Sequence, residues 1–239
     1  MKTHSGKLIA FEGIDGSGKS TQLKLLSKRL AEEGYEAISF DFPQHGERSA
    51  TLVDDYLVGK YGSINEVGPY QAAIFYACDR FDASFKIKAF LNAGKIVLCD
   101  RYAGSQAHQA AKIKDPQKKL KRTKFYQWAF DIEYNIFKIP RPDINLILKT
   151  SPEISFKLAD SGSISDVEKL ARRKAYLGDR PKDIAEIDIN HQKNSLDSYL
   201  QLVKKFPKDF ILIECMEREK LFSPQIIHEK IWEQVKKVI

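Results

Sequence analysis

The sequence has 239 residues, of which 43% are hydrophobic and 30% are charged, and its formal net charge is +7 at pH 7. This composition is typical of a globular protein, and no apolar run approaches the roughly 20 residues of a membrane-spanning helix. The excess of Lys and Arg favours an anionic partner, but it does not distinguish a nucleotide from a nucleic acid or from charge that only serves solubility.

Short apolar runs alternate with stretches of helical periodicity, which predicts βαβ units around a parallel sheet. We expect five strands, at residues 7–12, 36–41, 95–100, 143–149 and 209–214. We expect helices at residues 19–33, 49–57, 67–92, 116–137, 152–160, 184–205 and 224–238. Gly34 and Gly94 are predicted to end helices, and Ser223 with Pro224 to begin the last one. The expected fold is therefore α/β, with three layers and helices on both faces of a five-stranded sheet.

We interpret residues 1–239 as a single domain, because the prior of roughly 150 residues per domain does not require two. Residues 161–183 are rich in Gly, Ser and charge, which is typical of a mobile lid. The first residues carry no apolar stretch behind their charges, so we expect no targeting sequence and a cytoplasmic protein. Cys78, Cys99 and Cys215 lie far apart in apolar segments, which favours buried thiols.

A glycine-rich segment joins the first predicted strand to the first predicted helix and matches the spacing G-x-x-x-x-G-K-[ST]. The backbone N–H groups of such a loop cradle phosphate, helped by the positive end of the helix dipole. Lys19 is expected to contact the β- and γ-phosphates of ATP, and Ser20 to ligate Mg²⁺. The expected ATP-binding residues are Gly13, Ile14, Asp15, Gly16, Ser17, Gly18, Lys19, Ser20 and Thr21. The competing explanation, a chance Gly/Ser turn, does not account for the strand and helix in register on either side.

A phosphate loop by itself leaves the reaction open, because kinases, GTPases, ATPases and motor proteins share it. The sequence contains no Asn-Lys-x-Asp guanine signature, which weakens a GTPase interpretation. A second group of residues, Asp100-Arg101-Tyr102, follows the third predicted strand and should emerge at the same edge of the sheet. We expect Asp100 in the second coordination shell of Mg²⁺ and Arg101 on an acceptor phosphate. The alternative is an Asp–Arg pair that only caps a strand end.

These segments together resemble the thymidylate kinases, a family of P-loop NTPase fold within the nucleoside monophosphate kinases. The resemblance runs from Leu8 to about Val238 and rests on five segments of this sequence. They are Phe11-Glu12-Gly13-Ile14-Asp15, Phe42-Pro43, Phe75-Tyr76-Ala77-Cys78-Asp79-Arg80, Asp100-Arg101-Tyr102 with Ser105, and Pro140-Arg141-Pro142-Asp143. It implies ATP- and Mg²⁺-dependent phosphorylation of dTMP to dTDP, and a homodimer formed through long helices such as residues 67–92.

The resemblance also implies roles for single residues. Asp15 would bind the deoxyribose 3′-OH, Phe75 would stack on thymine, and Arg80 would donate to a thymine carbonyl. Phe75 has an equally plausible interpretation as a core residue of an amphipathic helix. Phe42, Pro43 and Ser105 complete the expected dTMP site.

Two regions depart from the family pattern. The stretch after Ser105 is one residue shorter, so His108 and Gln109 are our candidates for the ring beside the ribose and the glutamine that reads thymine. His45 stands where some relatives carry a phosphate-binding arginine, which leaves the acceptor phosphate mainly to Arg101. The phosphate loop carries no basic residue at Gly16 or Ser17, and relatives of this type use lid arginines, for which Arg173 and Arg180 are our candidates.

The alternatives are a kinase of another nucleotide or nucleoside and, in a different class, a P-loop ATPase stimulated by nucleic acid. The second rests only on net charge and on the basic run at residues 118–124, which we interpret as a solvated helix face. We expect nucleotides and a second copy of the chain as partners, and neither a membrane nor a nucleic acid.

Overall fold

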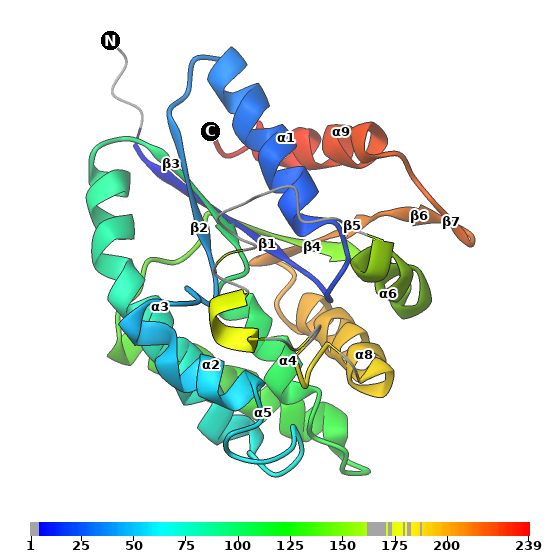
Figure 1. Ribbon diagram of the computed structural model, residues 1–239. Helices are drawn as coiled ribbons and strands as arrows, with labels where there is room; N and C mark the ends of the chain where they lie inside the picture. Colours follow the sequence, from blue (N-terminus) through cyan, green and yellow to red (C-terminus); the bar gives the residue numbers. More distant parts are fainter. Residues whose placement is uncertain (1–4, 162–170, 172–173, 179, 181–182, 187) are drawn as a thin grey trace.

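The computed structural model describes residues 5–161, 171, 174–178, 180, 183–186 and 188–239. Five parallel strands form one sheet in the order β2-β3-β1-β4-β5, so β1 and β3 lie side by side near its centre (Figure 1). The strands are β1 (Lys7–Glu12), β2 (Ala37–Asp41), β3 (Ile96–Asp100), β4 (Ile144–Lys149) and β5 (Phe210–Glu214). All five predicted strands are thus confirmed to within one residue.

Helices cover both faces of this sheet (Figure 1). On one face lie α1 (Lys19–Glu32) and α9 (Pro224–Val235), and on the other lie α3 (Pro69–Asn92), α4 (Gln106–Ala110), α5 (Lys118–Phe130) and α8 (Ile189–Lys205). Alternate residues of β1 face opposite layers, with Ile9 and Phe11 packed in the α1 and α9 core and Leu8 in the other. Burial on both faces explains why the strands are nearly continuous apolar runs, and the expected three-layer α/β fold is confirmed.

Shorter elements complete the chain. A 3₁₀ turn, η1 (Arg48–Ala50), leads into α2 (Thr51–Leu57), which packs on α3, and α6 (Pro152–Ser161) follows β4. The predicted helix ends hold at Gly34 and Gly94, where φ is +84° and +76°. Ser223 caps α9 as expected, since its side chain accepts a hydrogen bond from the N–H of Ile226.

The structure corrects several predicted boundaries. The helix expected at residues 116–137 is α5 followed by a π-helical segment, η3 (Asp131–Ile136), and the helix expected from residue 184 begins at Ile189, where Asp188 caps it. Among the described residues, the 3₁₀ turn η2 (Ala103–Ser105), α4, and the hairpin of β6 (Met216–Glu217) and β7 (Lys220–Leu221) were not predicted, and residues 174–177 are helical within the segment that was expected to be irregular. Such elements span five residues or fewer, so they show no periodicity from which a sequence pattern could predict them.

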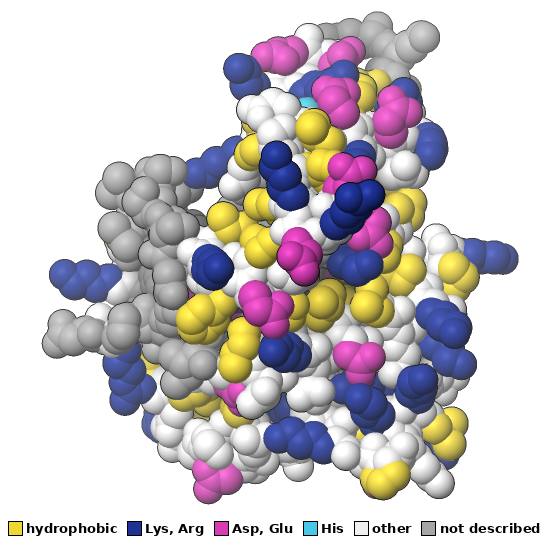
Figure 2. Space-filling view, turned by 90° about the vertical axis from the view of Figure 1, so that its right-hand side faces the viewer, with side chains coloured by type: hydrophobic (Ala, Val, Ile, Leu, Met, Phe, Trp, Pro, Cys, Tyr) yellow, Lys and Arg dark blue, Asp and Glu magenta, His cyan; other side chains and the backbone are white. Residues whose placement is uncertain are grey.

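The charged surface is mixed. In Figure 2 the basic side chains of one face lie among acidic and hydrophobic ones. The basic run at residues 118–124 belongs to α5 and is mainly solvent-facing, as expected, except that Arg122 is fully buried and pairs with Asp197. All three cysteines are free thiols, and Cys99 and Cys215 are buried. Within the described part of the chain, no helix combines the length and apolar character needed to cross a bilayer.

Candidate active site

The glycine-rich loop between β1 and α1 depends on backbone angles that glycine permits. Gly13, Gly16 and Gly18 have φ of +138°, +74° and +90°. A Cβ at Gly13 would lie 2.8 Å from the carbonyl oxygen of Leu148, so the loop packs tightly against β4 there. A Cβ at Gly18 would meet nothing within 4 Å. The loop is therefore packed on its sheet side and open at the start of α1, which fits a cradle for phosphate.

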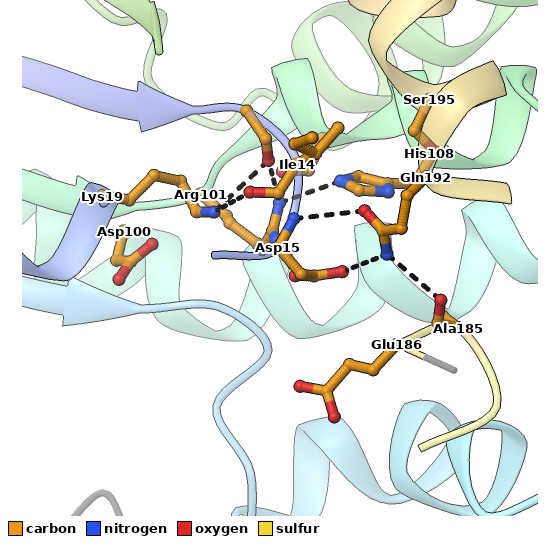
Figure 3. A network of polar contacts seen from close by, with 12 residues as sticks. Ile14, Asp15, Lys19, Asp100, Arg101, His108, Ala185, Glu186, Gln192 and Ser195 are labelled. Carbon is orange, nitrogen blue, oxygen red and sulfur yellow. Dashed lines mark hydrogen bonds and ion pairs between the residues drawn. The ribbon is translucent and has the colours of Figure 1, made fainter. Parts of the chain in front are cut away.

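The side chain of Lys19 folds back over this loop. Its Nζ donates to the carbonyl oxygens of Ile14 at 2.9 Å and Gly13 at 3.3 Å (Figure 3). The Nη1 of Arg101 donates to the same Gly13 oxygen at 2.9 Å. A cation at the start of α1 and a cation that follows β3 thus meet at one carbonyl group. Positive charge concentrated at one point of the sheet edge favours a ligand with several phosphates.

Arg101 is the centre of a polar network at the end of β3 (Figure 3). Its backbone has φ of +69°, in the left-handed region that is uncommon for a residue with a side chain. Its Nη2 forms an ion pair with Asp15, and its Nη1 lies 3.0 Å from His108 Nε2. Because a guanidinium can only donate, the Nε2 of His108 must be the acceptor.

The charges around Arg101 determine the protonation states of His108 and Asp15. Burial and the Arg101 guanidinium lower the pKa of His108 well below its ordinary value, so the imidazole is neutral at pH 7. Burial alone would raise the pKa of Asp15, but Arg101, together with His108, Lys19 and Gln192, holds it well below its usual range. Asp15 is therefore ionised, and His108 shows no sign of acid/base work.

Gln192 of α8 was not predicted. Its Oε1 accepts from the backbone N–H of Asp15 at 3.3 Å, and its Nε2 donates to Asp15 Oδ2 at 2.8 Å and to the carbonyl of Ala185 at 3.1 Å (Figure 3). One amide therefore joins the phosphate loop to residues 183–186. The two partners, Asp15 and Gln192, are 177 positions apart, so no local pattern could have indicated the contact.

Ser20 and Asp100 lie together, as expected for residues beside a magnesium ion. The hydroxyl of Ser20 donates to Asp100 Oδ2 at 2.6 Å, and Asp100 is 6% exposed. Hydroxyl and carboxylate oxygens are ligands that suit Mg²⁺. No group of three or more His, Cys, Asp or Glu among the described residues could hold a metal ion by itself. Such a site fits an ion that takes its other ligands from phosphates and water.

A buried carboxylate, Glu12, supports the turn that follows β3. It accepts hydrogen bonds from the backbone N–H of Tyr102 at 2.9 Å, the hydroxyl of Ser105 at 2.6 Å and the phenol of Tyr199 at 3.1 Å. Burial raises the pKa of Glu12. Ser105, which was expected to contact dTMP, therefore uses its hydroxyl proton within the protein. Glu12 was part of the family-like segment but had been given no role.

Phe75 of α3, which was expected to stack on thymine, packs against aromatic side chains of other segments. The ring of Phe75 packs against Tyr56 and Tyr61, with centroid distances of 6.5 and 5.9 Å. Burial raises the pKa of Tyr76 well above its ordinary value, and Arg101 and Asp15 are among the charges that act on it. Phe75 and Tyr76 both pack, partly buried, against the same hydrophobic cluster of α2 and α3. The competing interpretation of Phe75, as a core residue, agrees with this packing.

Phe42 is also a core residue. Its ring is 2% exposed and packs edge-on against Tyr102 at 5.7 Å, whereas Pro43 is half-buried. Arg80 is 1% exposed, and its Nε and Nη2 donate to Glu133 of η3. Gln109 is 4% exposed, and its Oε1 has no partner within the described residues.

Of the two lid candidates, the structure describes Arg180. Arg173 lies outside the described residues. Arg180 is exposed, and its Nη1 donates to the carbonyl of Val58 beside α2. His45 contacts Asp54 Oδ1 at 2.5 Å and stacks on Tyr176 at 4.0 Å. In this structure Arg180 is therefore not brought to the phosphate loop, and His45 joins Tyr176 to α2.

The chain resembles proteins of one family. A family model described as thymidylate kinase matches residues 11–226. A thymidylate kinase from Caldanaerobacter subterraneus is 30% identical over 89% of this chain and 88% of its own length, and one from Thermoanaerobacter sp. strain X514 is 30% identical over 98% and 99%. The solved structure of thymidylate kinase from Candida albicans superimposes with a TM-score of 0.65, covering 98% of this chain and 92% of that one at 22% identity.

Proposed function

The chain belongs to the thymidylate kinase family, and from that premise we propose that it transfers the γ-phosphoryl group of ATP to dTMP, giving dTDP and ADP. One observation carries this proposal: Lys19 and Arg101, from the phosphate loop and the end of β3, both donate to the Gly13 carbonyl. A donor phosphate held by Lys19 and an acceptor phosphate held by Arg101 would therefore be neighbours. Transfer between two neighbouring phosphates requires this arrangement.

The reaction needs charge control and alignment more than proton transfer. An oxygen of the dTMP phosphate attacks the γ-phosphorus while the bond to the β–γ bridging oxygen breaks, and the acceptor is already ionised, so no general base is required. Lys19 and the N–H groups of residues 13–21 hold the β- and γ-phosphates. Arg101 would bind the acceptor phosphate with its two terminal nitrogens, which are spaced for two parallel hydrogen bonds once Nη1 exchanges its contact with His108 for the phosphate.

We propose that Ser20 binds Mg²⁺ directly and Asp100 orients it, as their 2.6 Å contact supports. The bound ion would neutralise charge on the β- and γ-phosphates. The ion pair between Asp15 and Arg101 keeps Asp15 ionised and aligned, so that its Oδ2, which also accepts from Gln192, can accept a hydrogen bond from the sugar 3′-OH.

For the acceptor base we propose a revised set of contacts. Tyr76 joins Phe75 as a candidate for the aromatic face beside thymine, because the two are adjacent on α3 and pack against the same cluster. Arg80 keeps its proposed role as a donor to a thymine carbonyl through Nη1, the nitrogen that lies outside its pair with Glu133. We keep Pro43, His108 and Gln109 as residues of the site, and we propose that Phe42 and Ser105 shape it from behind.

The lid arginine remains a proposal with two candidates. Arg173 or, after movement away from Val58, Arg180 would bring positive charge to the transferring group only when substrate is bound. The prediction is that alanine at the active one of these positions lowers kcat, and unchanged turnover in both variants would rule the idea out.

We also propose that residues 1–239 act as one kinase domain in the cytoplasm and that two copies form a homodimer through α3. Phe81 and Phe85 of α3 are 39% and 61% exposed, and Ile136 of η3 is 58% exposed. An exposed apolar strip on a long helix supports burial against a second copy. Light scattering at a monomer mass would refute the dimer.

The test of the proposed function is direct. Purified protein is incubated with ATP, Mg²⁺ and each nucleoside monophosphate, and the diphosphates are separated by chromatography. We expect dTDP to form far faster than any other product and to require both ATP and Mg²⁺. Faster phosphorylation of another acceptor, or ATP hydrolysis that responds to DNA or RNA but not to dTMP, would overturn the assignment.

A further inference from the structure

Glu133 is a buried carboxylate that joins side chains from two other helices. Its Oε2 accepts from Arg80 Nε at 2.8 Å, and its Oε1 accepts both from Arg80 Nη2 and, at 2.8 Å, from Gln106 Nε2. Glu133, Arg80 and Gln106 are 0%, 1% and 2% exposed. Helices α3 and α4 therefore meet η3 at one carboxylate group, on the side of the sheet opposite α1 (Figure 1).

The π-helical backbone of η3 brings Glu133 inward. The N–H of Phe137 donates to the carbonyl of Ile132 at 2.8 Å, five residues back, so this turn is wider than an α-helical one. Glu133 is the buried residue of η3, while Asp131 and Asn135 are exposed. Widened turns of this kind are frequent at functional sites, because they change which side chain faces inward.

Glu133 also fixes which way the amide of Gln106 faces. A carboxylate and a backbone carbonyl can only accept hydrogen bonds, and Gln106 Nε2 donates to both Glu133 Oε1 and, at 3.2 Å, the carbonyl of Ala73. The amide oxygen of Gln106 must then face the other way. That Oε1 is buried and lacks a hydrogen-bond partner among the residues that the structure describes. A buried acceptor of this kind is costly unless a ligand supplies an N–H group.

Arg80 supplies the matching donor. It follows Tyr76 by four residues on α3, so the two side chains share a face of the helix. Its pair with Glu133 uses Nε and Nη2, which leaves Nη1 outside the pair. A donor on Arg80 and an acceptor on Gln106 complement the imide edge of thymine, where a carbonyl oxygen adjoins a ring N–H. On cytosine, an amino group adjoins an unprotonated ring nitrogen, so both contacts would be mismatched.

We propose that Glu133 is a specificity-positioning residue, which accepts from Arg80 and Gln106 and so sets them as a donor–acceptor pair that favours thymine over cytosine. This inference rests on the proposed function and concerns which base the proposed kinase selects. The competing explanation is a buried ion pair that only holds the helices together, in which case removal of its charge would change stability and leave selectivity alone.

The test compares the kcat/KM values for dTMP and dCMP in Glu133→Gln. A glutamine side chain at position 133 can donate as well as accept. The amide of Gln106 can then rotate so that its nitrogen and oxygen exchange places. We expect the ratio of kcat/KM for dTMP to that for dCMP to fall on the order of tenfold, the usual loss when a hydrogen-bond match is removed from a base-reading site. Glu133→Asp keeps a pure acceptor and should restore the ratio.

A matched control is Asp197→Asn. Asp197 also pairs with a buried arginine, since its Oδ2 accepts from Arg122 Nη1 at 2.7 Å, but it lies on α8 and faces α5. We expect this variant to lower the thermal unfolding midpoint and to leave the dTMP to dCMP ratio unchanged. A ratio that falls equally in both variants would assign the effect to general loss of stability.

The remaining outcomes are also decisive. A folded Glu133→Gln protein with the wild-type ratio would overturn the inference. If that variant does not fold, Gln106→Leu takes its place, because it removes the proposed acceptor and leaves the Arg80–Glu133 pair; an unchanged ratio there would equally overturn it. Wild-type protein that phosphorylates dTMP and dCMP equally well would refute the inference alone, whereas wild-type protein inactive on dTMP would refute the proposed function.

Discussion

Replacement of Arg101 by lysine keeps the positive charge and removes the geometry of the guanidinium. In the structure the two terminal nitrogens of Arg101 contact the Gly13 carbonyl, the Asp15 carboxylate and His108. A lysine ammonium group has one nitrogen and cannot contact all three partners at once, so we expect about two hydrogen bonds to be lost. At about 1.5 kcal/mol for each bond that involves a charged group, the loss is about 3 kcal/mol.

A loss of about the same size should appear in catalysis, because a lysine likewise cannot present the two parallel donors that are proposed to hold the acceptor phosphate. Since about 1.4 kcal/mol corresponds to tenfold, we expect kcat/KM for dTMP to fall roughly 100-fold. The assay follows ADP formation by a coupled reaction while dTMP is varied at saturating ATP and Mg²⁺. Arg29→Lys is the control, because Arg29 forms a surface ion pair with Glu229 at 2.7 Å on the other face of the sheet. Activity of Arg101→Lys within about threefold of wild type would refute the role we give to the guanidinium.

Three further predictions concern the phosphate loop, the proposed metal site and the titration of one lysine. Gly13→Ala should raise the KM for ATP at least about tenfold, because its Cβ would lie 2.8 Å from the Leu148 oxygen at a φ of +138°; a wild-type KM would contradict this. Asp100→Asn should increase the Mg²⁺ concentration that gives half the maximal rate roughly tenfold, since Asp100 accepts from Ser20, and an unchanged Mg²⁺ titration would argue against the proposed site. Burial lowers the pKa of Lys112 from 10.5 to about 7. Between these two pH values the unfolded chain binds a proton that the folded chain does not, so the free energy of unfolding should increase with pH. Lys112→Met should therefore flatten the rise of the thermal unfolding midpoint from about pH 7 to about pH 10, and parallel curves for the two proteins would exclude this titration.

Much of the fold could be predicted from local patterns in the sequence. Short apolar runs between stretches of helical periodicity predicted all five strands, because the spacing of apolar residues within a segment reflects the backbone period of that segment. The phosphate loop was equally predictable, since its spacing and its place between strand and helix both belong to one continuous segment. Parallel strands expose their carboxyl ends at one edge of the sheet, so the proximity of Arg101 to Gly13 also followed from the chain alone.

Other parts of the candidate site depended on how the helices rotate and pack. Phe75 and Tyr76 are adjacent in the sequence, and a turn of about 100° per residue on α3 points their rings in different directions. The sequence pattern predicted an uninterrupted helix through Glu133, yet a π-helical turn directs this carboxylate to Arg80 and Gln106. These choices follow from packing against the rest of the core, which a local pattern does not contain.

The sequence by itself therefore determined the five strands, the phosphate loop and the family, because each rests on short-range spacing that the backbone converts directly into geometry. The tertiary structure alone decided that Gln192 joins Asp15, that Glu12 supports Ser105, and that Glu133 holds Arg80. Each of these contacts satisfies a buried polar group, and its partner is whichever side chain the packed core brings within hydrogen-bonding distance. That choice depends on the free energy of the whole fold, so it is not encoded at any single position.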